Sequence, residues 1–294
     1  DHFDLVSGMP LPSQVAIYQA VKPGANVRPR GQDVQRGELV LSAGARLRAQ
    51  EIGFLSMLGY ARAPVHRQPR VAVLSSGDEL RPAGSPLPPG KIYDSNGPML
   101  ARLVEQAGGQ VIELGIVEDR IEAVEASLAQ ARQEDADLLI SSAGVSVGAF
   151  DHVRAVIERS GTLEFWRVNI RPGKPFAFGH YAGLPVFGLP GNPVSAFIGF
   201  QVFVRPVLDY LTGRPVERPR QPARLAQAIE SDGRESYLRA ILEPSGQGWQ
   251  ARLTGHQGSG NLRSLVQANA LIIIPSLVKS LPAGVEVEAW WLDD

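Results

Sequence analysis

A turn of small residues between an apolar run and a helical segment is the first feature that suggests chemistry. The run 136–140 is typical of a buried strand, and His152–Ser160 is typical of a short helix. Between them lies Ser141–Asp151, whose candidate ligand-binding residues are Gly144, Ser146 and Gly148. Glycines let the backbone approach an anion, and free N–H groups at a helix start point toward it. The turn is predicted to hold a phosphate, although it could also connect the two elements without a ligand.

Two stiff loops farther along carry more polar groups. Arg171 and Lys174 stand on either side of Pro172-Gly173. Proline restricts its own backbone and that of the residue before it, so the two cations are well placed for an oxyanion. The alternative is a solvated basic turn. The second loop, 188–193, contains Pro190 and Asn192; Asn192 before a proline is typical of a helix start, whose N–H groups could also face a phosphate.

Acidic residues follow other predicted strands. Gly77 and Asp78 come after the first strand, Asp119 follows the second, and Asp94 and Asn96 lie in the loop between the first strand and its helix. In an open parallel sheet, ligands bind at the carboxyl ends of the strands. Acids beside a phosphate cradle suggest a phosphate ester whose charge is bridged by Mg²⁺.

Each acid also has a plain structural interpretation. Asp151 could merely cap its helix, and so could Asp94 or Ser95. Asp119 could simply end a strand in a turn. His152 is the only histidine beside a candidate acid, and we expect it to be a surface residue.

Regular strand–helix alternation begins at Arg70 and predicts the scaffold that positions these groups. It predicts a mostly parallel sheet with helices on both faces. The predicted strands are 71–75, 111–117, 136–140, 165–170, 176–178 and 186–189. The predicted helices are 98–107, 121–131, 152–160 and 192–211, the last bent at Pro206.

The flanking segments have a different character. After a Pro/Arg-rich linker, 225–230, 237–242, 250–253, 270–274 and 285–292 are predicted to be short strands of a small β barrel or sandwich. Before residue 70, β structure is expected at 14–21 and 26–41, and a helix at 49–58 closed by Gly59. The domains are therefore expected to be 1–68, an incomplete mixed α/β part, 69–213, the α/β domain, and 214–294, the β domain.

Composition narrows the function classes. The formal net charge of −1 argues against wholesale nucleic-acid binding. With no cysteine among 294 residues, disulfides, thiolate metal sites and cysteine nucleophiles are excluded, and a reducing cytoplasm is compatible. No apolar run reaches the roughly 20 residues that a membrane helix needs. The first residues, Asp1-His2-Phe3-Asp4, lack methionine and do not look like a signal peptide, so we expect a truncated start.

An ordered set of motifs resembles the molybdopterin molybdenumtransferases: bacterial MoeA, plant Cnx E domains and the gephyrin E domain. The turn at 141–151 and the loops 172–175 and 188–193 resemble three of the family's motifs. Residues 21–28 resemble its VKPGENVR, 76–80 its TGDEL, 92–96 its IYDSN and 255–259 its GHQGS. The resemblance covers essentially all of 21–294.

The resemblance implies an enzyme that inserts molybdate into adenylylated molybdopterin and releases AMP, as a cytoplasmic, Mg²⁺-dependent homodimer. Asp119 and Asp151 would bind the cation, and Arg171 and Lys174 would lie on the molybdate and phosphate side. The adenylate side would include Asp78, Asp94, Asn96 and Ser146. Arg239 and Ser259 match motifs proposed to touch molybdate. The adenylyltransferase and acceptor molybdoenzymes are possible partners.

Three departures from the family pattern leave alternatives open. Ala143 replaces a usual glycine, Ala149 replaces a usual acid, and the family's early DGYA region is absent. One alternative is a molybdopterin adenylyltransferase, which resembles the central domain alone. Another is a non-catalytic, gephyrin-like scaffold, in which the two alanines would reflect lost catalysis.

Overall fold

The chain divides into two units, Asp1–Ile52 and Gly53–Asp294. The computed structural model describes residues 13–14, 16, 18–143, 152–246 and 248–292. The β structure predicted for 14–21 and 26–41 is wrong, because the described residues there form turns and irregular segments. Almost all of them are exposed, and local turn bonds such as Ala25 N to Lys22 O (3.0 Å) take the place of strand pairing. An alternating pattern yields a strand only where one face can be buried.

The predicted helix at 49–58 is present as α1, Ala49–Met57. It ends as expected: Gly59 has a φ of 86° and the Tyr60 N–H donates to the Leu55 carbonyl at 2.9 Å. A left-handed glycine with such a bond is a common helix terminus.

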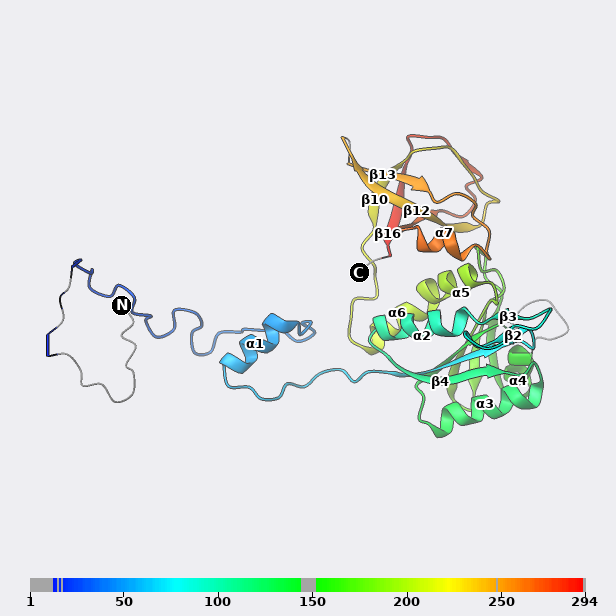
Figure 1. The fold of residues 1–294 in the computed structure, drawn as a ribbon, viewed down its shortest axis with the longest axis horizontal. Coiled ribbons are helices and arrows are strands. Elements are labelled where there is room, and N and C mark those ends of the chain that lie inside the picture. Colours follow the sequence, from blue (N-terminus) through cyan, green and yellow to red (C-terminus); the bar gives the residue numbers. More distant parts are fainter. Residues whose placement is uncertain (1–12, 15, 17, 144–151, 247, 293–294) are drawn as a thin grey trace. The chain divides into compact units, whose positions relative to one another are not determined.

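A six-stranded mixed sheet forms the centre of the second unit (Figure 1), with the order β4-β1-β5-β9-β8-β6. Its strands are β1 (Arg70–Ser76), β4 (Gln110–Val117), β5 (Leu138–Ser142), β6 (Gly161–Trp166), β8 (Ala177–Tyr181) and β9 (Leu184–Leu189). The β4, β1, β5 and β9 strands run parallel, whereas β8 is antiparallel to both its neighbours. The prediction of a mostly parallel sheet is confirmed.

Helices cover both faces of this sheet. The helix α2 (Asn96–Gln106) packs with Val71 and Val73 on one face, together with the helical segment that follows β9. On the other face α3 (Ile121–Gln133) and α4 (His152–Ser160) pack against Ala72 and Leu74. Alternate residues of β1 thus serve two cores, as expected of a strand buried on both faces. A small outlying pair, β2 (Leu80–Arg81) and β3 (Ile92–Tyr93), borders the start of α2.

The long helix predicted for 192–211 contains a change of hydrogen-bond register. It comprises α5 (Pro193–Gly199), a π-helical turn (Phe200–Val204) and α6 (Arg205–Leu211). The π turn immediately precedes Pro206, whose missing N–H would interrupt an α-helical ladder. By length and composition Pro193–Leu211 could cross a membrane, but 61% of its apolar window is buried inside the protein.

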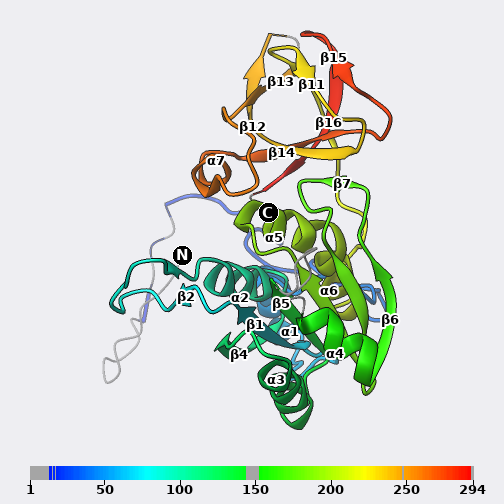
Figure 2. The same cartoon turned by 90° about the vertical axis from the view of Figure 1, so that its right-hand side faces the viewer.

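The carboxy-terminal strands form a closed five-stranded barrel (Figure 2). They are β10 (Gln221–Leu225), β12 (Glu235–Ser245), β13 (Gly248–Leu253), β14 (Ala270–Ile274) and β16 (Glu286–Trp291), with β12–β13 and β10–β13 pairings closing the ring. A two-stranded β11 (Ile229–Glu230) and β15 (Ser280–Leu281) lies alongside, and the short helix α7 (Leu262–Val266) was not predicted. The strand β7 (Ile170–Arg171) leaves the α/β domain and pairs with β12.

Candidate functional site

The carboxyl ends of β1 and β4 bring two predicted acids together. Asp78 follows β1 and Asp119 follows β4; the Asp119 N–H donates to Asp78 Oδ1 at 3.1 Å. The Ser76 hydroxyl donates to Asp119 Oδ1 at 3.2 Å. Because β1 and β4 are parallel neighbours, their ends lie at one edge and these contacts follow from the topology. Gly77 is buried at this edge with a φ of 152°, and an added Cβ would lie 2.8 Å from Glu79 Oε2.

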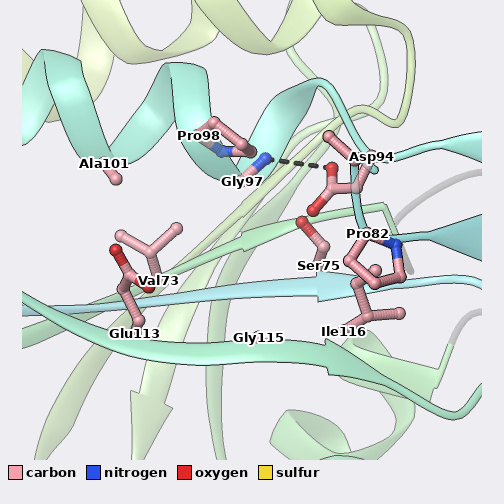
Figure 3. Close-up of a pocket in the computed structure, with 11 residues that line it drawn as sticks. Val73, Ser75, Pro82, Asp94, Gly97, Pro98, Ala101, Glu113, Gly115 and Ile116 are labelled. Carbon is pink, nitrogen blue, oxygen red and sulfur yellow. Dashed lines mark hydrogen bonds between the residues drawn. The ribbon is translucent and has the colours of Figure 1, made fainter. Parts of the chain in front are cut away.

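Asp94 caps the start of α2. Its Oδ1 accepts hydrogen bonds from the N–H groups of Asn96 and Gly97, both at 3.0 Å. Figure 3 shows the bond from Gly97. Ser95, the other candidate cap, makes no side-chain cap bond. The structural interpretation of Asp94 is therefore correct for Oδ1, while Oδ2 is directed toward Ser75 and the helix.

Asn96 connects three of the predicted loops. Its side chain is 7% exposed, and Nδ2 donates to Ser142 Oγ at 3.0 Å and to the Gly191 carbonyl at 2.7 Å. Ser142 ends β5, and Gly191 follows β9 next to the buried Pro190. Asn96 Oδ1 is buried without a hydrogen-bond partner among the described residues. One amide thus holds the starts of two loops against α2.

The turn that was predicted to hold a phosphate starts at Ser141, and the described residues end within it, at Ala143. Ala143 has a φ of 76°, and its N–H donates to the Leu189 carbonyl at 2.9 Å. Gly144, Ser146, Gly148 and Asp151 lie outside the described residues, so their predicted roles remain predictions.

His152, expected to be a surface residue, instead faces the acidic edge. Its side chain is 17% exposed, and Nε2 lies 3.9 Å from Asp119 Oδ1. At the far end of the same edge, the guanidinium carbons of Arg154 and Arg167 each lie 3.8 Å from the ring centroid of Trp166. The sequence analysis considered His152 but assigned it to the surface, and it did not single out Arg154, Arg167 or Trp166, because residue spacing alone does not reveal which helix start meets which strand end.

The barrel contributes directly to the end of β9. Asn192 Nδ2 donates to Ser259 Oγ at 3.0 Å, and the Val194 N–H donates to the Ser259 carbonyl at 3.0 Å. Asn192 occupies the cap position with Pro193 at the first helical turn, as predicted, but its side chain makes no cap bond. It instead links the α/β domain to the barrel.

Arg239 lies under the loop that carries Ser259. Its side chain is fully buried and donates to Ser264 Oγ (3.0 Å) and to the carbonyls of Gln257 (3.3 Å) and Gly258 (3.0 Å). Burial, with a smaller contribution from the positive charge of Arg171, lowers the pKa of Arg239 to about 10. Arg239 therefore supports the backbone of the 256–258 loop.

Arg171 and Lys174 lie on the connection between the sheet and the barrel. Arg171 pairs with Ser236 in the β7–β12 ladder, and Nη1 lies 3.8 Å from Asp232 Oδ2. Lys174 is exposed, and its carbonyl accepts from the Val168 N–H at 3.0 Å. An added Cβ at Gly173, between them, would meet the Ser195 carbonyl of α5 at 3.7 Å. The basic loop therefore packs near the start of α5, on the same side as Asn192.

Within the described part of the chain, no group of three or more carboxylates and histidines is arranged to hold a metal ion. Asp78 and Asp119 nevertheless bring two carboxylates to neighbouring strand ends, where the Asp119 N–H bonds to Asp78 Oδ1. Mg²⁺ is usually held by only one or two carboxylates, with the remaining positions taken by phosphate and water. The described acids are thus compatible with a Mg²⁺ ion whose remaining coordination positions are filled by oxygen atoms of the substrate and by water.

The fold and the site define a class: an α/β domain that gathers acidic residues and the starts of several loops at the carboxyl ends of its parallel strands, joined to a small β barrel. Family models agree with this architecture. Residues 72–210 match the "probable molybdopterin binding domain", 222–292 the MoeA C-terminal region (domain IV) and 6–59 the MoeA N-terminal region (domains I and II). The chain belongs to the molybdopterin molybdenumtransferase family.

Individual relatives support this assignment. The chain is 38% identical over 277 residues to a molybdopterin molybdenumtransferase of Haemophilus influenzae, covering 93% of this chain and 68% of the relative. It is 39% identical over 284 residues to molybdopterin molybdenumtransferase 2 of Mycobacterium tuberculosis, covering 94% and 69%. A molybdopterin biosynthesis MoeA structure from Pyrococcus horikoshii superposes with a TM-score of 0.78 at 35% identity, covering 90% of this chain and 64% of that one. The chain thus spans about two thirds of the length of these relatives.

Proposed function

We propose that this chain inserts molybdate into adenylylated molybdopterin, with release of AMP. The observation that carries the proposal is the convergence at one sheet edge of acids, loop starts and a barrel residue. Asp119 contacts Asp78, Asn96 joins the ends of β5 and β9, and Ser259 reaches in from the barrel. An adenylylated pterin presents a phosphoanhydride, which needs this combination of cation ligands and anion donors.

Magnesium is part of the proposal. Asp119, with Asp78 beside it and Asp151 from the turn, would hold Mg²⁺. When bound, the ion would neutralise charge on the departing AMP.

The basic residues are assigned to molybdate and phosphate. Molybdate is a tetrahedral dianion, which suits Arg171 and Lys174 on a loop stiffened by proline. Ser259 would contact the oxyanion from the barrel side, while Arg239 acts through the loop that it supports. Asn96 and Asn192 would orient the loops that receive the adenylate.

Two other functions are less well supported. An adenylyltransferase resembles the α/β domain alone, whereas here residues 222–292 match the MoeA C-terminal region. A scaffold role is suggested by a gephyrin of Dictyostelium discoideum, 32% identical over 315 residues, of which this chain covers 44%. A homodimer in the cytoplasm, receiving substrate from an adenylyltransferase and delivering cofactor to molybdoenzymes, completes the proposal.

An assay with two substrates tests it. The full chain is incubated with Mg²⁺ and either ATP plus molybdopterin or adenylylated molybdopterin plus molybdate. We expect AMP release only from the second mixture. Consumption of ATP would support the adenylyltransferase instead, and inertness toward both mixtures would support the scaffold.

A further inference from the structure

Lys91 is a half-buried cation that lies beside the acidic strand ends and has none of the roles considered above. It lines a hollow of about 590 Å³ together with Asp78, Arg81, Glu118 and Arg120. Its Nζ donates to the main-chain carbonyl of Asp78 at 3.0 Å. A lysine that bonds to a main-chain carbonyl next to two candidate metal ligands acts on the backbone that carries them.

The local sequence places Lys91 next to Asp78. Residues 88–91 form a β-turn, which is closed by a 3.2 Å bond from the last N–H to the first carbonyl. Gly90 has a φ of 78°, the left-handed value that the third position of a type II turn requires. The strand β3 begins at the next residue, and its first N–H donates to the Glu79 carbonyl at 2.9 Å. The turn and the strand pairing therefore bring the Lys91 side chain alongside the end of β1.

Asp78 lies at the second position of a tight turn. The turn comprises residues 77–80 and is closed by a 3.0 Å bond from the last N–H to the first carbonyl. Turns of type I and type II differ mainly in the orientation of their central peptide group. In this turn the carbonyl of that group belongs to Asp78, and it accepts from Lys91 Nζ at 3.0 Å and from Arg81 Nη1 at 3.3 Å. Two cations thus hold the central peptide in one orientation.

The Asp78 side chain in turn contacts Asp119. Asp78 Oδ1 accepts from the Asp119 N–H at 3.1 Å, and Asp119 Oδ1 accepts from the Ser76 hydroxyl at 3.2 Å. Asp78 is exposed, so no core packing fixes its side chain. Resting on the proposed function, in which Asp78 and Asp119 hold Mg²⁺, we propose that Lys91 is a positioning residue. By fixing the main chain of Asp78, it keeps the two carboxylates arranged for the cation.

The charge of Lys91 and its positioning contact have opposite effects on cation binding. A positive charge beside a metal site repels the metal ion, so loss of the charge alone would tighten binding. Loss of the contact would weaken binding, because the carboxylates would spend less time in the arrangement that binds the ion. Arg120 provides the comparison: it lines the same hollow, where its Nε donates to the Glu118 carboxylate at 2.8 Å.

Binding of Mn²⁺ to the full chain, followed by electron paramagnetic resonance, measures the two effects without turnover. Lys91→Met should weaken Mn²⁺ binding about fivefold, and Lys91→Arg, which keeps a donor, should stay within about twofold of the wild type. Arg120→Met removes an equal charge from the hollow and should bind Mn²⁺ as tightly as the wild type or more tightly. Lys279→Met, at an exposed position of the barrel, controls for the substitution itself.

Hydrogen exchange of the Asp119 N–H in the metal-free chain tests the positioning separately. Because this N–H bonds to Asp78 Oδ1, it should exchange about threefold or more faster in Lys91→Met than in the wild type. In Lys279→Met it should exchange at the wild-type rate.

The failures of the two proposals can be told apart. An unchanged exchange rate at Asp119 in Lys91→Met would overturn the positioning role, as would Mn²⁺ binding equal to or tighter than that of the wild type. If the wild type binds no Mn²⁺, the magnesium part of the proposed function fails, and the exchange rate alone decides the role of Lys91. Absence of AMP release from adenylylated molybdopterin would count against the proposed function alone, because neither measurement depends on turnover.

Discussion

Ala143 is an alanine in a backbone conformation that favours glycine. Its φ is 76°, directly after the end of β5. A left-handed conformation costs a non-glycine residue roughly 1–2 kcal/mol, part of which is offset because glycine has more freedom in the unfolded chain. The departure from the family's usual glycine is thus a local source of strain.

Ala143→Gly should therefore stabilise the protein by about 0.5–1 kcal/mol. Ala182, with a φ of 47° in the turn between β8 and β9, should respond in the same direction. Ala126→Gly, in the exposed face of α3, should destabilise instead. Thermal unfolding of the three variants measures these shifts. A loss of stability in Ala143→Gly comparable to that in Ala126→Gly would show that Ala143 is not strained.

Arg239 donates hydrogen bonds to the 256–258 loop from inside the barrel, so its replacement should strongly lower the free energy of unfolding. Arg239→Ala leaves the carbonyls of Gln257 and Gly258 without their donor, and we expect a loss of about 3 kcal/mol or more. The control is Arg252→Ala on the next strand, whose side chain is 49% exposed and whose Nε lies 3.9 Å from Glu243 Oε1. Denaturant unfolding compares the two. Similar small losses in both variants would rule out the supporting role.

Residue types in the sequence predicted which residues lie at the candidate site better than they predicted which of those residues contact one another. Asp78, Asp94, Asn96 and Asp119 were predicted from loops after strands, and the structure places all four at the same edge. The bond between Asn96 and Ser142, the proximity of His152 to Asp119 and the buried Ser75 hydroxyl, which has no hydrogen-bond partner among the described residues, were not predictable. Each depends on which residues from distant elements meet, which a single sequence does not encode in its spacing.

At the scale of elements, Asp137 connects the amino-terminal ends of β1 and β5, at the edge of the sheet opposite the candidate site. It accepts hydrogen bonds from the Arg67 guanidinium and from the Arg70 N–H, the latter at 2.8 Å. These bonds, that from Arg67 first, lower the pKa of Asp137 below its ordinary value of 3.8. The folded state therefore binds fewer protons than the unfolded state, and stability rises with pH through this region.

The contribution of Asp137 should be fully present above about pH 4 and should disappear as the pH falls through its lowered pKa. Asp137→Asn should cost about 1 kcal/mol at pH 7, because Arg67 is exposed and solvent screens that pair. The difference from the wild type should shrink toward pH 2. Unfolding measured from pH 2 to 7 checks this, with the exposed Asp135→Asn as the control. A pH-independent difference would exclude the charge as its cause.

Helices and strands that pack a long face into a core were predicted correctly. Two errors concern segments that have no such face: 26–41, where β structure was predicted but does not form, and the short helix α7, which was not predicted. The 3.6-residue period predicted α2 and α3, and apolar runs predicted β1, β5 and β14, because each of these elements packs into a core. The alternating pattern at 26–41 does not form a strand, since almost all of these residues are exposed and no face of the segment is buried. The helix α7 has only five residues and is held by the Asn261 cap, so it leaves no periodic signal.

At the scale of the whole molecule, the barrel is attached to the site through Asn192 and Ser259. The variants Asn192→Ala and Ser259→Ala should each weaken this contact, and the double variant should lose less than the sum of the two. A coupling of about 0.5–1.5 kcal/mol in unfolding free energy is expected for one hydrogen bond. Additive losses would show that this side-chain hydrogen bond adds nothing to the other links between the two domains, such as the β7–β12 pairing.

The most direct measurement is a single turnover of adenylylated molybdopterin with molybdate, following AMP and pterin-bound molybdenum together. We predict that the full chain releases one AMP for each molybdenum bound, that chelation of Mg²⁺ stops both, and that Asp119→Asn slows both by at least about tenfold. Glu286→Asn on the barrel is the control. AMP release without molybdenum binding, or normal turnover in Asp119→Asn, would contradict the assignment of this edge as the site of molybdenum insertion.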